Sequence, residues 1–176
     1  MPLTLSAAER SEIERACERL VYVYSRALDL GDMDAAADCF AEQGSMARPM
    51  TPGQIVQGRE AIRAALRSRP KTLLTRHLAT NVMIDVESRE TARGYSCLTM
   101  ISTTPGAGAT PPHVAPGPLW FGEFHDRFVR VDGAVCLTPA QSCRAAAVVA
   151  RASGAPEFVS RGAEKLVAAL DHFGFD

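Results

Sequence analysis

Three side chains in this sequence have the types and the spacing that acid–base chemistry requires. Tyr24 and Asp29 lie near the end of a long amphipathic segment, and His77 follows Asp29 by 48 residues, at the start of an alternating segment. Histidine exchanges a proton near neutral pH, and a neighbouring carboxylate can orient its ring. A carboxylate near a helix C-terminus faces the negative end of the helix dipole, which costs about 0.3–1 kcal/mol unless a cation lies nearby. We therefore expect Asp29 and His77 to lie within hydrogen-bond reach of each other, beside a cavity.

Each of these residues also has an ordinary structural alternative. A single histidine in a strand more often packs in the interior than it catalyses, and Arg26 could offset the charge of Asp29. Tyr24 falls on the apolar face of its segment, where its ring would pack and its hydroxyl would find a partner. His125 alternates in phase with Phe121 and Glu123, whereas Trp120, Phe124 and Phe128 take the other face, so we expect His125 to point away from a cavity lined by those three aromatic residues.

The sequence lacks the motifs of the common cofactor and hydrolase sites. It contains no GxGxxG, no P-loop, no HExxH, no GxSxG and no CxxC. Five cysteines are present, an odd number without metal-ligand spacing, and we expect reduced thiols. We therefore expect neither a metal nor a cofactor.

Composition narrows the class of protein further. The 176 residues suit one domain, with 47% hydrophobic and 22% charged residues. Nineteen Lys and Arg stand against twenty Asp and Glu, so no basic surplus favours nucleic acid or an anionic membrane as a partner. No apolar run approaches the roughly 18 residues of a membrane span, and no signal peptide is evident, so we expect a cytoplasmic protein.

The first part of the chain has the periodicity of helices. Ser6 and Glu9 form a capping-box pattern before a long amphipathic helix, which Gly31 should end. Asp32 can cap a short second helix. A short strand is expected over residues 45–50, followed by a third helix from Arg59 to about Arg69.

From Leu73 onward the hydrophobic period changes from 3.6 to 2, which indicates strands. Four strands are predicted: one whose residues Leu78, Thr80, Val82, Ile84 and Val86 share a face, then Thr91–Thr103, Leu119–Val131 and Ala134 to about Val148. Pro139 in the last strand implies a bulge or an edge position. A long Pro-rich loop occupies residues 104–118, and a last helix is expected at about Ser160–His172.

This order of elements predicts an α+β fold, because helices come first and an antiparallel meander follows. A curved sheet wrapped on the long N-terminal helix would form a cone-shaped barrel over residues 1–150, with a helical tail over residues 151–176. The cone leaves an apolar cavity suited to a small molecule. The residues that we expect to line it are Phe40, Met46, Trp120, Phe124 and Phe128.

Four runs of residues, in this order, carry a family resemblance: Tyr24–Asp34 continued by Cys39–Glu42, Gly58–Ile62, Arg76–Asn81 and Asp126–Gly133. Together they resemble the SnoaL-like proteins of the nuclear transport factor 2-like superfamily, over about residues 10 to 148. The resemblance implies the cone-shaped, cystatin-like fold. It implies less about activity, because this fold hosts many functions.

Within that superfamily, Tyr24, Asp29 and His77 match catalytic positions of bile acid 7α-dehydratase. Asp29 and His77 also match the dyad of hexachlorocyclohexane dehydrochlorinase and, more loosely, that of scytalone dehydratase. The resemblance therefore implies elimination chemistry, with His77 as general base, Asp29 orienting it, and Tyr24 donating to a developing negative charge. The sequence departs from the family pattern in two places. A residue near Arg48 replaces a second tyrosine expected shortly after the second helix, and the arginine expected in the last strand has only Arg144, several residues out of place, as its candidate. Arg48 and Arg144 are therefore the candidate substrate-binding arginines.

Two classes of function fit this pattern. One is a cofactor-independent lyase or isomerase acting on a mid-sized apolar ring compound, with a polyketide cyclase as the main enzymatic rival. The other is a non-catalytic relative, either a ligand-binding module or a protein like the β-subunit of ring-hydroxylating dioxygenases. A cone also leaves the convex face of its sheet bare, so we expect a homotrimer or homodimer in which Val82, Ile84 and Val86, or their neighbours, are covered.

Overall fold

The computed structural model describes residues 5–47, 54–113, 119–144 and 148–149. Arg48, the segment 151–176 and the helix predicted at 160–172 lie outside the described residues. The helices are α1 (Ala7–Leu30), α2 (Met33–Asp38) and α3 (Arg59–Arg67); the strands are β1 (Ser45–Ala47), β2 (Ile55–Gln57), β3 (Leu74–Val86), β4 (Thr91–Thr103), β5 (Leu119–Val131), β6 (Ala134–Arg144) and β7 (Val148–Val149). None of the helices in this part of the chain has the length and apolarity needed to cross a membrane.

Both ends of α1 form as the sequence predicts. The Ser6 side chain accepts the Glu9 backbone N–H, and the Glu9 carboxylate accepts the Ser6 N–H at 2.8 Å, which completes a capping box. Gly31 ends the helix with φ +76°, a left-handed conformation that glycine adopts without strain. These two signals bracket Asp29 in the last turn of the helix.

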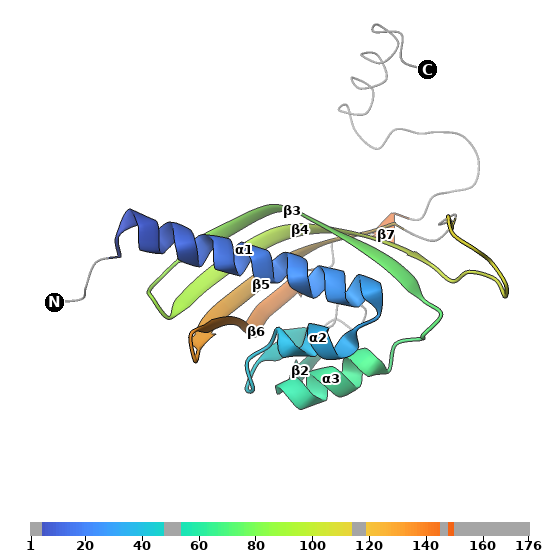
Figure 1. Cartoon of the computed structure of the whole chain (residues 1–176), viewed down its shortest axis with the longest axis horizontal. Coiled ribbons are helices and arrows are strands. Elements are labelled where there is room, and N and C mark those ends of the chain that lie inside the picture. Colours follow the sequence, from blue (N-terminus) through green and yellow to red (C-terminus); the bar gives the residue numbers. More distant parts are fainter. Residues whose placement is uncertain (1–4, 48–53, 114–118, 145–147, 150–176) are drawn as a thin grey trace, which may run out of the picture.

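The long strands form one antiparallel sheet in the order β3-β4-β5-β6, with β7 also pairing with β5. Figure 1 shows α1 lying along one face of the curved sheet, with α2 and α3 beside the end of α1. We call the sheet face toward α1 the inner face and the other the outer face. The expected α+β fold, a curled antiparallel half-barrel wrapped on the N-terminal helix, is confirmed.

A bulge in β3 changes which residues share a face. Pairing with β4 shifts between Thr80 and Met83, where Asn81 has φ +52°. Leu78, before the bulge, is 49% exposed, whereas Val86, after it, is 4% exposed and belongs to the core. The predicted common face of Leu78, Thr80, Val82, Ile84 and Val86 is therefore wrong. The last three residues pack inward against the core and cannot be the ones left bare on the outer face.

The edge strand β6 carries the irregularity that Pro139 predicted. His125 of β5 pairs with Ser142, while Arg127 pairs with Thr138, so three residues of β6 lie opposite one residue of β5. The strand is both an edge strand and a bulged one, as a proline without a backbone donor requires. The predicted strand to Val148 divides into β6 and the short β7.

Candidate active site

Asp29 in the last turn of α1 and His77 near the start of β3 lie side by side. His77 Nδ1 lies 2.5 Å from Asp29 Oδ1. Both side chains are largely buried, with 7% of the His77 side chain and 16% of the Asp29 side chain exposed. The partner of Asp29 is thus His77 from a segment 48 residues away, rather than its own neighbour Arg26. The expected juxtaposition is present.

Asp29 accepts hydrogen bonds from three donors. Thr75 Oγ1 donates to Oδ1 at 3.2 Å, the His77 backbone N–H donates to Oδ2 at 2.9 Å, and the imidazole Nδ1 lies at Oδ1. An ionised carboxylate only accepts, so this set of donors is complementary to the charged form. The carboxylate is therefore held in one orientation from both of its oxygens.

Burial lowers the pKa of His77 below its usual value of 6.5. The carboxylate of Asp29 acts in the opposite direction, and the Arg69 guanidinium lowers the pKa further. His77 is therefore neutral at pH 7. Because Asp29 can only accept, the single imidazole proton sits on Nδ1. Nε2 then carries a lone pair, and it makes no hydrogen bond to any residue that the structure describes.

Tyr24 lies among the residues packed against the core. Its hydroxyl donates to Met46 Sδ at 3.6 Å, and its ring meets the edge of Phe40 at 5.5 Å between centroids. Tyr24 is therefore in contact with Phe40 and with Met46, all three selected from the sequence.

A row of side chains crosses the inner face of the sheet at the level of His77. His77 lies opposite Met100 on β4, and Met100 lies opposite Trp120 on β5. Adjacent strands are about 4.8 Å apart, which places the Trp120 backbone about 10 Å from that of His77. Trp120 and Phe124 are half-buried and alternate onto this face. They form the apolar side of the candidate site.

Phe40 and Phe128, also expected to line the cavity, lie deeper. They are 4% and 2% exposed and belong to the core, so a ligand would have to displace neighbours to reach them. Arg144 pairs through its backbone with Glu123 at the end of β6. Arg48 lies outside the described residues.

Sequence reasoning missed Thr75 and the two arginines beside the pair. Arg69 Nη2 donates to Thr75 Oγ1 at 3.4 Å, and Arg76 Nη1 donates to the Asp29 carbonyl at 3.3 Å. A signal for Thr75 was present, because it lies two residues before His77 in a strand and must share its face. Nothing local marks Arg69, which reaches Thr75 from the connection after α3.

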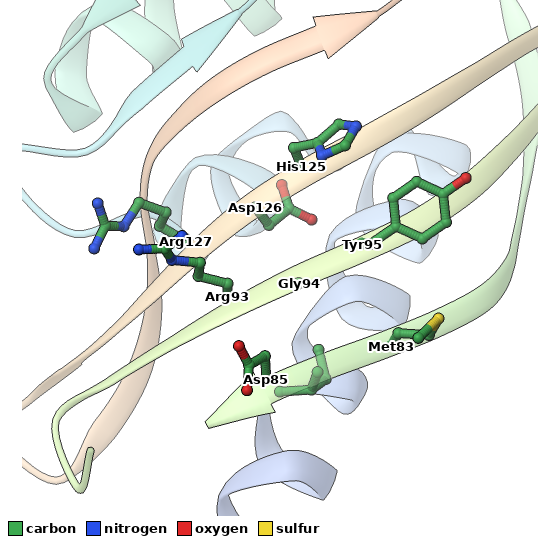
Figure 2. Close-up of a pocket in the computed structure, with 9 residues that line it drawn as sticks. Met83, Asp85, Arg93, Gly94, Tyr95, His125, Asp126 and Arg127 are labelled. Atoms are coloured by element: carbon green, nitrogen blue, oxygen red, sulfur yellow. The ribbon is translucent and has the colours of Figure 1, made fainter. Parts of the chain in front are cut away.

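His125 lies on the outer face, as its phase predicted. It borders a pocket of about 390 Å³ whose lining includes Tyr95, Arg93 and Arg127 (Figure 2). Its Nε2 is 3.6 Å from Glu123 Oε2, and its ring meets Tyr95 edge-on at 5.3 Å. This pocket is on the opposite side of the sheet from His77. No group of three or more potential metal ligands occurs within the described residues.

The curled sheet and the buried histidine–carboxylate pair define an α+β protein of the cystatin-like type with a candidate acid–base site. A family model described as a SnoaL-like domain matches residues 9–135. The chain belongs to this SnoaL-like family. Comparison with curated proteins gives no match.

Solved structures share this fold at low sequence identity. A candidate scytalone dehydratase from Novosphingobium aromaticivorans is 22% identical, with a TM-score of 0.70, over 89% of this chain and 99% of that one. A hexachlorocyclohexane dehydrochlorinase is 13% identical, with a TM-score of 0.64, over 86% and 98%. A Nostoc punctiforme protein of unknown function with a cystatin-like fold is 20% identical, with a TM-score of 0.56, over 79% and 91%. These likenesses establish the fold alone.

Proposed function

We propose that this protein is a lyase or isomerase that removes a proton from carbon in a mid-sized apolar ring compound. The observation that carries the proposal is the buried, neutral His77, held at Nδ1 by Asp29 and left with a lone pair at Nε2. A neutral imidazole is a competent general base near pH 7, and it needs no cofactor for this step. Asp29 stabilises the imidazolium that forms.

In the proposed step the C–H proton goes to His77 Nε2, and the C–H electron pair forms a carbon–carbon double bond. In a lyase the leaving group departs from the adjacent carbon with its bonding electron pair. In an isomerase the π pair of an adjacent carbonyl moves onto oxygen, and His77 then returns the proton at another carbon as the carbonyl re-forms. The Tyr24 hydroxyl would donate a hydrogen bond to the substrate oxygen on which negative charge develops.

The proposed substrate surface is the apolar row beside the base. Trp120 and Phe124 offer aromatic area on the inner face, and Met46 lies beside the Tyr24 hydroxyl. Elimination is favoured because the similar structures include a candidate dehydratase and a dehydrochlorinase. A cytoplasmic setting belongs to the same proposal, since Cys17, Cys39, Cys97 and Cys136 are free thiols.

A self-associated state also belongs to the proposal, as a homotrimer or homodimer. The outer face exposes three large apolar side chains, Leu78, Met83 and Phe121, at 49%, 67% and 41%. The same face carries Arg93 with Glu87, an ion pair of 2.5 Å whose partners could pair equally well across two copies. A second copy of the chain is the proposed occupant of this face.

Proton exchange with solvent tests the chemistry before the substrate is identified. The protein is incubated in D₂O with a panel of steroid, terpenoid and aromatic polyketide compounds, and deuterium uptake and mass loss are followed by mass spectrometry. At least one compound should acquire deuterium or lose a small molecule. His77→Gln should reduce that rate by roughly 10²–10⁴-fold, the usual contribution of a general base.

His125→Gln is the matched control, because it removes the other strand histidine from the outer face. It should keep the rate of the unmodified protein. Tight binding of a panel compound without exchange or turnover would contradict the proposal and favour the ligand-binding alternative. Equal rates for His77→Gln and His125→Gln would also contradict it.

A further inference from the structure

Thr75 lies between a cation and the carboxylate of the proposed site. Its hydroxyl accepts a hydrogen bond from Arg69 Nη2 at 3.4 Å and donates one to Asp29 Oδ1 at 3.2 Å. The residue is 3% exposed, so the described geometry is shielded from water. Arg69, Thr75, Asp29 and His77 thus form one continuous chain of hydrogen bonds.

We propose that Thr75 and Arg69 are positioning residues, a relay that fixes the Asp29 carboxylate and thereby keeps the His77 proton on Nδ1. The inference rests on the proposed function, because a positioned Nε2 lone pair matters only if His77 acts as a base. Neither residue touches the substrate; both act through Asp29.

The direction of each hydrogen bond follows from the donors available. A guanidinium has no acceptor, so Arg69 must donate to the Thr75 oxygen. The single hydroxyl hydrogen of Thr75 then points to Asp29, which can only accept. Threonine is also restricted about χ1, since its β-carbon is branched. Arg69 therefore selects the orientation of a hydroxyl that could otherwise rotate.

The relay also holds the plane of the carboxylate. Oδ2 is fixed by the His77 backbone N–H at 2.9 Å, and Oδ1 receives both the Thr75 hydroxyl and the imidazole. Without the Thr75 hydroxyl, only Oδ2 is held by a group other than the imidazole, and the carboxylate could turn about its own bond and leave Nδ1. The free imidazole would then exchange its proton between Nδ1 and Nε2, and molecules with the proton on Nε2 could not accept one there.

The charges around His77 act in opposite directions: the Asp29 carboxylate raises its pKa and the Arg69 guanidinium lowers it. Among the described residues, those beside the pair are Asp29, Arg69 and Arg76, and the last of these donates to the carbonyl oxygens of Asp29 and Thr75. Across the sheet, the neighbour of His77 is Met100, which does not titrate. Removing Arg69 removes a repelling cation, which should make His77 easier to protonate.

Nuclear magnetic resonance of ¹⁵N-histidine-labelled protein tests the relay without a substrate, because the two ring nitrogens report protonation directly. In the unmodified protein, Nδ1 should appear protonated and Nε2 unprotonated. Thr75→Val should give intermediate shifts at both nitrogens, and Thr75→Ser should restore the shifts of the unmodified protein. Arg69→Gln should raise the His77 titration midpoint, because a repelling cation is removed.

Two control variants separate the relay from general perturbation. Ser96→Ala removes another buried hydroxyl from the inner face, one that has no hydrogen-bond partner within the described residues. Arg67→Gln removes an arginine near the end of α3 that pairs with Asp34 instead. Both should leave the His77 midpoint and ring shifts unchanged. If Thr75→Val does not fold, Thr75→Ser and the partly exposed Arg69→Gln carry the test.

The outcomes distinguish the relay from the function. Unchanged His77 shifts and midpoint in Thr75→Val and Arg69→Gln would overturn the relay, whatever the activity. Shifted readings in a protein that catalyses no exchange would confirm the relay geometry and contradict the proposed function alone. With an active substrate, Thr75→Val should lower kcat at a nearly constant KM, and Thr75→Ser should recover it.

Discussion

The protonation state of His77 is the residue-scale property on which the proposed chemistry depends. Burial and the Arg69 charge lower its pKa below 6.5, and only the Asp29 carboxylate acts against them. An isolated histidine in a strand would have given no such balance. The distinction between a structural and a catalytic histidine therefore lies in its neighbours. These are Asp29 and Arg69, which precede His77 by 48 and 8 residues.

The pH profile of turnover follows from that balance. Because the base must be neutral, kcat/KM should be constant near pH 7 and fall only below pH 6.5, as His77 becomes protonated. Asp29→Asn removes the charge that raises the His77 pKa, so the acid limb should move to lower pH while the plateau falls. A limb that moves to higher pH in Asp29→Asn would contradict the assigned roles. Initial rates between pH 4.5 and 8 measure both quantities.

Asp126 is a second side chain whose titration should be measurable. It lies on β5 between His125 and Arg127 (Figure 2), and burial raises its pKa from 3.8 to about 6. The folded state therefore holds a proton that the unfolded state releases between these pH values. The free energy of unfolding should decrease as pH rises from about 4 to 6, and Asp126→Asn should abolish that decrease.

Above pH 6, Asp126→Asn should be more stable than the unmodified protein by up to about 2 kcal/mol. A pKa rise of about two units corresponds to about 2.7 kcal/mol, and the stability difference is smaller because the side chain keeps some contact with solvent. Chemical denaturation at several pH values measures the difference. Asp85→Asn, an exposed carboxylate on the outer face, serves as the control and should leave the slope unchanged. Lower stability of Asp126→Asn at pH 7.5 would show that the carboxylate is favourably paired.

At the scale of elements, close packing between β4 and β5 gives the clearest expectation. A β-carbon on Gly94 would lie 2.7 Å from Phe128 Cε2, and Phe128 is 2% exposed. Gly94→Ala should therefore cost about 1–3 kcal/mol through overpacking. The loss should appear as a lower midpoint in thermal and denaturant unfolding.

A double-mutant cycle tests whether the collision with Phe128 causes this loss of stability. Phe128→Leu removes the atoms that collide, so the combined variant should lose less stability than the sum of the two single variants. Additive losses would place the strain elsewhere. Gly106→Ala, at a glycine with open space around it, should be nearly neutral in the same measurement.

Local signals explain which elements the sequence predicted. The capping box and Gly31 bracket α1, and alternation identifies the four long strands. The bulge at Asn81 was not predictable, because the alternating run of apolar residues continues through it without a break. The residues after it consequently face the core, although the pattern placed them with Leu78. The contacts of Arg69 and Thr75 were also hidden, since they depend on how α3 meets β3.

At the scale of the whole molecule, the outer face should control self-association. Met83 is 67% exposed on β3, beside the outer pocket. Met83→Asp should convert the proposed homotrimer or homodimer into a monomer, because burying an uncompensated carboxylate is costly. Light scattering at micromolar concentration measures the mass.

Ile55→Asp is the control for that change, since Ile55 is 61% exposed but lies on the separate β1–β2 pair. It should leave the mass unchanged. A monomeric unmodified protein would contradict the proposed association. Loss of mass in both variants would show a general effect of the introduced charge.

Two parts of the candidate site come from different elements of the fold, so evolution or design could alter them independently. Asp29, Thr75 and His77 come from the end of α1 and the start of β3, whereas the facing row comes from β4 and β5 through Met100 and Trp120. Libraries confined to Met100, Trp120 and Phe124 should therefore change which ring compounds are accepted while the ¹⁵N signature of His77 stays constant. In such a scaffold, substrate range can diversify by exchange of wall residues, and the proton-transfer apparatus is inherited intact.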